Sequence, residues 1–178
     1  MVRPEQQESL RKIKVIISDV DGVMTDGGII LGAGGQEFKR YDVKDGMGIT
    51  MARKAGLKVC IITGRKSESV TIRAEELKFD GVYQGYFNKV EAFQAMKKEF
   101  RLDDENFLHL GDDILDIPLF EIVGFSVSPA DGIKQVTAIV DHVTTAPGGR
   151  GVLRETVELV LEAQGKLDDV IRELTTFS

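Results

Sequence analysis

The chain has little cysteine, tryptophan or proline. Its 178 residues include one cysteine, no tryptophan and four prolines. The lone cysteine, Cys60, excludes an internal disulfide, and we interpret it as a small buried hydrophobe in a reducing compartment. No apolar run is long enough to span a membrane, and the N-terminus lacks a secretory apolar segment. These absences predict a cytoplasmic protein.

An excess of positive charge is also missing. Lys and Arg number 23 against 29 Asp and Glu, which gives a formal net charge of −6 and a pI near 5.0. General binding to nucleic acid depends on clustered cations, so this balance argues against it. Hydrophobic residues make up 42% of the chain. That share, at this length, predicts a single domain over residues 1–178 with a substantial core.

Short apolar runs alternate with amphipathic segments along most of the chain. Helical patterns occupy the intervals, near 46–55, over 67–77, from Lys89, and through a C-terminal helix and tail over 151–178. The apolar runs predict strands at 15–17, 59–62, 82–83, 107–110 and 125–127. Repeated β-α units are typical of an α/β fold with a mainly parallel sheet between helical layers.

One segment, residues 28–41, interrupts this alternation. Two short strand patterns, 29–31 and 38–41, flank the glycine-rich run at 32–35. The pattern predicts an antiparallel hairpin outside the parallel sheet. Because an isolated hairpin is marginal in water, we expect this one to pack on something, and another subunit is a good candidate.

The first predicted strand ends abruptly at Asp19 and Asp21. Alternate residues of a strand share a face, so both carboxylates can converge where the chain leaves the sheet. Two anions that close need a cation, and Mg²⁺ prefers hard oxygen ligands. The alternative is a strand that ends in an acidic turn.

Three further polar groups follow predicted strands. They are Thr63-Gly64-Arg65, Lys89 at a helix start, and the acids of 111–116. Parallel α/β sheets bind ligands beyond the carboxyl ends of their strands. Each group alone also has a structural explanation: a turn, a solvated lysine, or acids that cap a helix.

In order and strand context, these residues resemble the four motifs of the haloacid dehalogenase superfamily of phosphotransferases. The matching residues lie between about 13 and 130 and are Asp19-Val20-Asp21, Thr63, Lys89 and Gly111-Asp112-Asp113-Ile114-Leu115-Asp116. A closer likeness, to the 3-deoxy-D-manno-octulosonate (KDO) 8-phosphate phosphatase family, covers almost the whole chain. It rests on segments 25–28, 42–46, 63–66, 83–85, 148–151 and 164–168. The resemblance implies the three-layer Rossmann-like fold of that superfamily. It also implies a phosphoric monoester hydrolase that releases KDO and phosphate during synthesis of lipopolysaccharide precursors.

The resemblance also implies roles for the motif residues. Asp19 would attack phosphorus to give an aspartyl-phosphate, and Asp21 would act as general acid and then base. Thr63 would hydrogen-bond a phosphoryl oxygen, and Lys89 would neutralise its charge. Asp112, Asp19 and the backbone carbonyl of Asp21 would hold Mg²⁺.

Two more acids follow in the last motif, Asp113 and Asp116. They would lie behind the metal ligands and orient Lys89 or a metal-bound water. For Asp116, a role as a first-turn helix acid explains the sequence equally well.

Cations outside the motifs are candidates for recognising the carboxylate or phosphate of a sugar acid phosphate. Arg65, Arg73 and Arg150 match substrate-binding positions of the family, although Arg73 fits a solvated helix face equally well. The other residues that the resemblance places at the substrate are Asp21, Asp42, Val43, Lys44, Asp45, Gly46, Gly64, Lys89 and Asp113. Thr50 is a departure, because relatives commonly carry an arginine there, so the preferred sugar acid stays open.

The motif spacing leaves no room for a separate cap domain. The hairpin and one helix fill the interval between Asp21 and Thr63, and a helix and a strand fill the next. Because enzymes gain by enclosing such intermediates, a neighbouring subunit must cover a capless site. The resembling family implies a homotetramer whose hairpins associate and whose C-terminal segment reaches an adjacent site.

Four other interpretations concern residues or function. His109 and His142 each lie in or beside an apolar strand without a second metal ligand, so we interpret both as structural.

The nearest functional rival is a phosphatase of a sialic-type nine-carbon sugar acid 9-phosphate. A signalling receiver domain would place adjacent acids after the first strand, and a non-catalytic phosphatase-like module would be expected to lack a motif residue.

Overall fold

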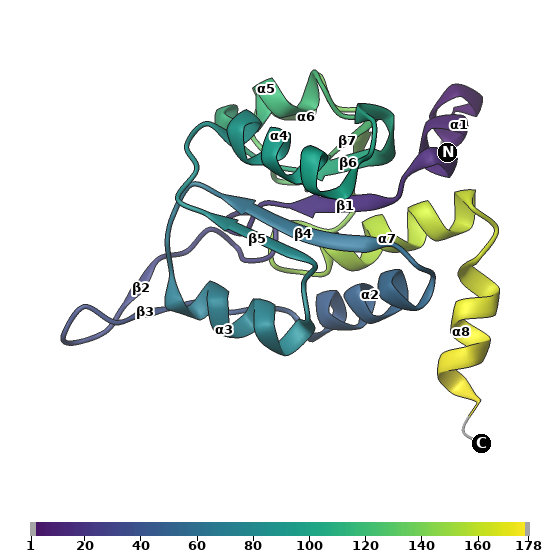
Figure 1. Ribbon diagram of the computed structural model, residues 1–178. Coiled ribbons are helices and arrows are strands. Elements are labelled where there is room, and N and C mark those ends of the chain that lie inside the picture. Colours follow the sequence, from purple (N-terminus) through teal and green to yellow (C-terminus); the bar gives the residue numbers. More distant parts are fainter. Residues whose placement is uncertain (1–2, 177–178) are drawn as a thin grey trace.

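The computed structural model describes residues 3–176, in which one parallel sheet forms the centre (Figure 1). Its strand order is β5-β4-β1-β6-β7-β8, and every neighbouring pair is parallel. The strands are β1 (Val15–Ser18), β4 (Lys58–Thr63), β5 (Gly81–Gln84), β6 (Phe107–Leu110), β7 (Phe125–Ser128) and β8 (His142–Val143). The predicted α/β fold with a parallel sheet is confirmed.

Helices cover both faces of the sheet, which is why β1, β6 and β7 are buried throughout and consist mostly of apolar residues. Successive side chains of β1 pack against the helices on opposite faces of the sheet. Ile16 joins the core under α2 and α7, whereas Val15 and Ile17 pack under α4 and α5. One layer contains α1 (Pro4–Lys12), α2 (Val43–Lys54), α3 (Glu68–Leu77), α7 (Val152–Ala163) and α8 (Leu167–Thr175), and the other contains α4 (Lys89–Phe100), α5 (Ile117–Phe120) and α6 (Lys134–Thr137).

Strand β1 lies at the switch point of the topology. From β1 the chain passes to β4 and β5 on one side, and then to β6, β7 and β8 on the other. In open α/β sheets this reversal leaves a crevice at the carboxyl ends of the strands, where ligands bind. The crevice is therefore expected above the ends of β4, β1 and β6.

The hairpin extends away from the sheet (Figure 1). Strand β2 (Ile30–Leu31) pairs antiparallel with β3 (Glu37–Phe38), as predicted. The paired part is shorter than expected, because residues 39–41 lie beyond the ladder. Apolar side chains on it face solvent, with Ile30, Leu31 and Phe38 exposed by 54%, 70% and 54%.

Several elements differ from the sequence-based expectation, among them the short helices α5 and α6, which were not predicted. Helix α1 was not predicted, because Leu10 is its sole buried residue and its sequence therefore carries no apolar stripe. The two-residue edge strand β8 is too short to give a pattern. The expected tail forms a second helix, α8, after a left-handed turn at Gly165. Within residues 3–176, no helix combines the length and apolar character that crossing a bilayer requires.

Candidate active site

Four predicted residues meet at the carboxyl ends of three adjacent strands. Asp19 and Asp21 follow β1, Thr63 is the last residue of β4, and Asp112 follows β6. The Asp19 amide donates to the Leu110 carbonyl at 3.0 Å, which extends the β1–β6 pairing to the first acid. All four residues line one cavity of about 320 Å³. The expected gathering of acids and hydroxyl at one sheet edge is present in the structure.

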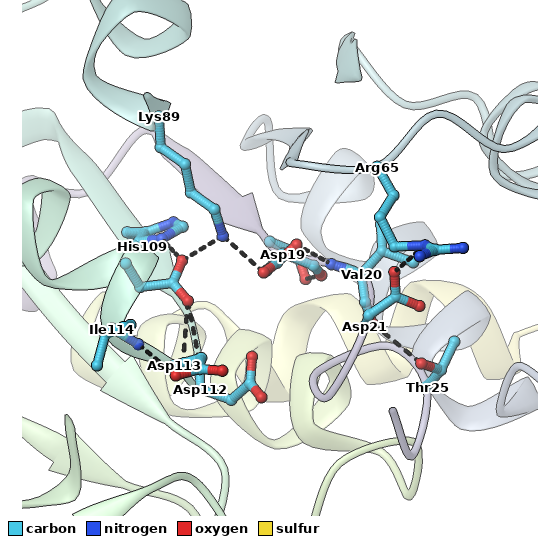
Figure 2. A network of polar contacts seen from close by, with 12 residues as sticks. Asp19, Val20, Asp21, Thr25, Arg65, Lys89, His109, Asp112, Asp113 and Ile114 are labelled. Carbon is cyan, nitrogen blue, oxygen red and sulfur yellow. Dashed lines mark hydrogen bonds and ion pairs between the residues drawn. The ribbon is translucent and has the colours of Figure 1, made fainter. Parts of the chain in front are cut away.

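Lys89 enters this cavity from the first residue of α4 (Figure 2). Its side chain is 2% exposed, and its ammonium donates to Asp19 Oδ2 at 2.6 Å and to Asp116 Oδ1. Burial lowers the pKa of Lys89, but the negative charges of Asp19 and Asp116 outweigh burial and raise it. The lysine therefore stays cationic beside the nucleophile candidate.

Asp116 is fully buried, and donors occupy both of its oxygens. Oδ1 accepts from Lys89 and lies 2.7 Å from His109 Nε2, while Oδ2 accepts from the amides of Asp112 and Asp113 at 3.2 and 3.3 Å. Both sequence-based interpretations of Asp116 thus describe it in part, since it is a first-turn acid that binds the amides just before the short 3₁₀ helix Ile114–Asp116, and it also fixes Lys89. Asp113 differs, because its exposed carboxylate accepts from the Ile114 amide and makes no contact with Lys89.

The arrangement of acids suits a divalent cation. Carboxylate oxygens of Asp19, Asp112 and Asp116 lie within 4.8 Å of one another. Each oxygen of Asp116 already has two hydrogen-bond contacts, whereas each oxygen of Asp19 has one, so Asp19 and Asp112 are the two acids that can offer oxygens to an ion. Burial, and then the charges of Asp19 and Asp116, raise the pKa of Asp112 to about 7. Such uncompensated negative charge favours a bound cation, which would hold the carboxylates ionised.

Gly22 allows this carboxylate to lie against the loop after β1. Its φ is +84°, and a Cβ built there would lie 2.1 Å from Asp112 Oδ2. A side chain at position 22 would therefore occupy the place of the Asp112 carboxylate.

Asp21 has partners that the sequence did not reveal. Its carboxylate pairs with Lys39, which follows β3, and its Oδ2 lies 3.8 Å from Arg65 Nε. Lys39 was missed because a charged residue in a hairpin is usually solvated. The one available signal for Lys39 was its spacing from Glu37. The two residues flank Phe38 in a strand pattern, so their side chains are expected on the same face of the hairpin.

The residues expected at the substrate fall into three groups. Gly64, Arg65 and Asp113 line the same cavity as the three acids and the Thr63 hydroxyl described above, together with Asp21 and Lys89. Val43 and Arg73 line a separate, larger cavity of about 970 Å³ between the hairpin and α3. Arg73 pairs there with Glu76 at 2.8 Å. The rest line neither cavity, and they are Asp42, Lys44, Asp45, Gly46 and Arg150.

Asp45 has a structural partner within this chain. Its side chain is buried, and Oδ1 accepts from the Arg154 amide at 3.0 Å in the first turn of α7. Burial raises the pKa of Asp45 to about 6. The Asp45 carboxylate thus bonds a helix start, where a negative charge is favoured, and does not face the cavity.

Arg150 lies near the site although it lines neither of these two cavities. The loop that carries it packs on the loop after β1, where the Gly149 amide donates to the Val23 carbonyl at 2.9 Å. Gly148 makes this close approach possible, because a Cβ there would lie 2.2 Å from the Gly22 carbonyl oxygen. The exposed Arg150 side chain therefore stands beside the loop of Asp21.

The cavity also has an apolar rim that the sequence analysis did not single out. Phe87 and Leu115 line it and are 71% and 44% exposed. Neither residue carries a polar group, so motif reasoning gives no signal for them.

Comparisons with known proteins agree with this geometry. A family model described as haloacid dehalogenase-like hydrolase matches residues 81–155. The 3-deoxy-D-manno-octulosonate 8-phosphate phosphatase KdsC of Salmonella typhimurium is 42% identical over 94% of this chain and 89% of that protein. The crystal structure of the phosphatase of the same name from Yersinia pestis superposes with a TM-score of 0.92 at 36% identity, covering 94% of this chain and 90% of that one. The Moraxella catarrhalis enzyme, solved in complex with magnesium, phosphate and KDO, gives a TM-score of 0.92 at 35% identity over 95% and 97%. The chain therefore belongs to the 3-deoxy-D-manno-octulosonate 8-phosphate phosphatase family of the haloacid dehalogenase superfamily.

Proposed function

We propose that this chain is a Mg²⁺-dependent phosphatase that hydrolyses 3-deoxy-D-manno-octulosonate 8-phosphate to KDO and phosphate. The observation that carries the proposal is the Asp19 carboxylate, held by Lys89 at 2.6 Å and flanked by Asp21 and Asp112 in one cavity. The relatives at about 42% identity, with names that state this activity, support the choice of substrate.

Asp19 is the nucleophile in this proposal. One carboxylate oxygen attacks phosphorus, the bond between phosphorus and the sugar oxygen breaks, and an aspartyl-phosphate forms. Val20 and Lys89 orient the side chain, because the Val20 amide donates to Oδ1 at 2.6 Å and Lys89 donates to Oδ2. Water then attacks phosphorus and releases the Asp19 carboxylate and inorganic phosphate.

Asp21 moves the proton in both halves of the reaction. It gives a proton to the departing sugar oxygen and later takes one from the attacking water, a role worth about 10²- to 10⁴-fold in rate. The hydroxyl of Thr63 donates to a phosphoryl oxygen from the end of β4. Lys89 balances the charge of the phosphoryl group, since phosphoryl transfer depends mainly on positioning and electrostatics.

The ion of this site is proposed to be Mg²⁺, held by Asp19, Asp112 and the backbone carbonyl of Asp21. When bound, Mg²⁺ neutralises charge on the phosphoryl oxygens and on the carboxylates around them. The raised pKa of Asp112 supports this assignment, because it reflects a buried excess of negative charge.

The identity of the sugar acid is tested by a kinetic panel. The family resemblance leads us to expect an arginine where this chain has Thr50, so the eight-carbon acid 8-phosphate must be compared with a nine-carbon sialic-type acid 9-phosphate. We expect a clear preference in kcat/KM for the eight-carbon substrate, abolished by chelation and restored by Mg²⁺. Equal or reversed values would exclude the assignment, and turnover that survives chelation would exclude the metal requirement.

We also propose that the chain acts as one capless domain that associates through its hairpin into a homotetramer. The exposed Ile30, Leu31 and Phe38 support the association, because several large apolar side chains exposed on a short hairpin mark an interaction site. A neighbouring copy would also cover Val43 and Arg73 in the larger cavity. This arrangement accounts for candidate substrate residues that lie outside the catalytic cavity of their own chain.

A further inference from the structure

The side chain of Asp21 is held from the hairpin. Its Oδ1 accepts from the ammonium of Lys39, and within residues 3–176 the remaining side-chain partner is Arg65, whose Nε is 3.8 Å from Oδ2. The Lys39 side chain is 1% exposed, whereas that of Asp21 is 23% exposed toward the cavity. The carboxylate thus faces the substrate space with a shielded cation behind it.

Glu37 ties both cations together. Its Oε1 lies 3.2 Å from Lys39 Nζ, and its Oε2 accepts from the guanidinium of Arg65. The hydrogen bond from Arg65, followed by smaller contributions from Ser67 and Lys39, lowers the pKa of Glu37 to about 2. Two carboxylates and two cations therefore alternate in one network that joins β1, the hairpin and the loop after β4.

This network separates two cavities. Asp21 and Arg65 line the catalytic cavity, and Glu37 and Lys39 line the larger one between the hairpin and α3. The hairpin itself is weakly built, since the β2–β3 ladder contains two residue pairs. Ion pairs at its base therefore do most to fix where it meets the catalytic loop.

We infer that Lys39 is a positioning residue, which holds the Asp21 carboxylate where it must exchange a proton with the sugar oxygen and with water. The inference rests on the proposed phosphatase function and adds the hairpin to the parts on which turnover depends. Lys39 is not a substrate ligand, because its ammonium is shielded from solvent and lies between two carboxylates. Without it, Asp21 would keep the 3.8 Å approach to the half-exposed Arg65 and would sample other rotamers.

The leaving group gives the test its specificity. A sugar alkoxide needs a proton as it departs, whereas p-nitrophenolate is stable without one. For Lys39→Met, which keeps the apolar stem, we expect kcat/KM on the sugar acid phosphate to fall by about 10- to 100-fold, because small displacements of a catalytic group cost about that much and kcat/KM covers the steps up to departure of the leaving group. We expect kcat/KM on p-nitrophenyl phosphate to change by less than about threefold, because the later attack of water, which Asp21 also assists, does not enter kcat/KM, and we expect Lys39→Arg to restore part of the loss.

A double mutant and a matched control complete the experiment. In an Asp21→Asn background, Lys39→Met should remove no further activity, because the group it positions is already gone. Arg40→Met is the control, since Arg40 is the next residue and pairs with Asp26 on the exposed side. Arg40→Met should leave the ratio of the kcat/KM values for the two substrates unchanged. If Lys39→Met does not fold, Glu37→Gln replaces it in the test. It weakens the ion pair between Glu37 and Lys39, so it should lower kcat/KM on the sugar acid phosphate more than kcat/KM on p-nitrophenyl phosphate.

The outcomes separate this inference from the proposed function. Equal losses in kcat/KM on both substrates, or none on either, would overturn the role of Lys39 while Mg²⁺-dependent turnover by the unaltered chain still supports the phosphatase. Absence of turnover in the unaltered chain on both substrates would overturn the proposed function. In that case the inference fails with it.

Discussion

His109 Nε2 lies 2.7 Å from Asp116 Oδ1, and both side chains are fully buried between the sheet and α5. The imidazole of His109 also packs against the ring of Phe120, with 5.2 Å between centroids. Asp116 in turn binds Lys89, so the histidine acts on the catalytic cavity through a buried carboxylate. His109 is thus structural, as interpreted from sequence, but it supports the lysine that contacts Asp19.

The His109–Asp116 contact predicts a stability difference between two variants. His109→Phe keeps a planar ring beside Phe120 but removes the donor to a buried carboxylate, so we expect it to destabilise the fold by about 1–3 kcal/mol. His109→Gln keeps an N–H group near the same point and should lose less. Urea unfolding measures both, and the m value should stay constant. A Phe variant as stable as the parent would show that the contact contributes nothing.

Removal of the nucleophile predicts loss of turnover without loss of fold. Asp19→Asn keeps the size of the side chain and an oxygen for the Val20 amide, but it removes the attacking carboxylate. We expect kcat to fall by at least about 10⁴-fold, as for other nucleophile replacements. Circular dichroism should match that of the parent. Residual hydrolysis near the parental rate would refute the assignment of Asp19.

The acid cluster predicts that Mg²⁺ stabilises the fold. Ligands that bind the native state alone raise the free energy of unfolding as their concentration exceeds Kd, by about 2.7 kcal/mol at 100 times Kd. A magnesium titration followed by thermal unfolding should therefore raise Tm in the parent. Asp112→Asn should abolish this rise, while Asp113→Asn should retain it, since the exposed Asp113 binds the Ile114 amide. An unchanged magnesium response in Asp112→Asn would exclude Asp112 as a ligand.

Asp45 predicts a pH dependence of stability away from the catalytic cavity. Burial raises its pKa from 3.8 to about 6, so the folded state binds this proton more tightly than the unfolded state does. Stability should therefore fall as pH rises between these values and level off above the higher one. A pKa rise of this size corresponds to about 3 kcal/mol.

The check for Asp45 is a neutral replacement. Asp45→Asn keeps the acceptor for the Arg154 amide, so its stability relative to the parent should increase between about pH 4 and pH 7. Asp168→Asn, on the exposed face of α8, serves as the control, and its stability should depend on pH in the same way as that of the parent. If the stability of Asp45→Asn followed the same pH dependence as that of the parent, the pKa of Asp45 would not be raised by folding.

The hairpin surface predicts the assembly state. Phe38→Asp together with Leu31→Asp places charge on side chains that are 54% and 70% exposed, so the fold of the single chain should be kept. We expect the parent to scatter light as a tetramer and the double variant as a smaller species with reduced turnover. A monomeric parent with full activity would remove the argument that a neighbour covers the site.

Much of the site could be predicted because its residues lie at or just after the ends of strands that are mostly apolar. Burial of β1, β4 and β6 leaves a clear run in the sequence, so the acids and Thr63 at their ends stand out. The contact between Asp45 and Arg154 could not be predicted, because the two residues are 109 positions apart. The role of Lys39 was hidden for a similar reason. A lysine in a short hairpin looks solvated until the fold brings it to Asp21.

The glycine at position 22 has a consequence for how this family can diverge. Because the Asp112 carboxylate takes the space that a Cβ at position 22 would need, substitution there would leave the hydrophobic core unchanged and still displace a proposed ion ligand. Descendants that change this residue would keep the architecture and lose the chemistry. A folded but inactive paralogue could therefore arise in a single step while all its charged motifs remain intact.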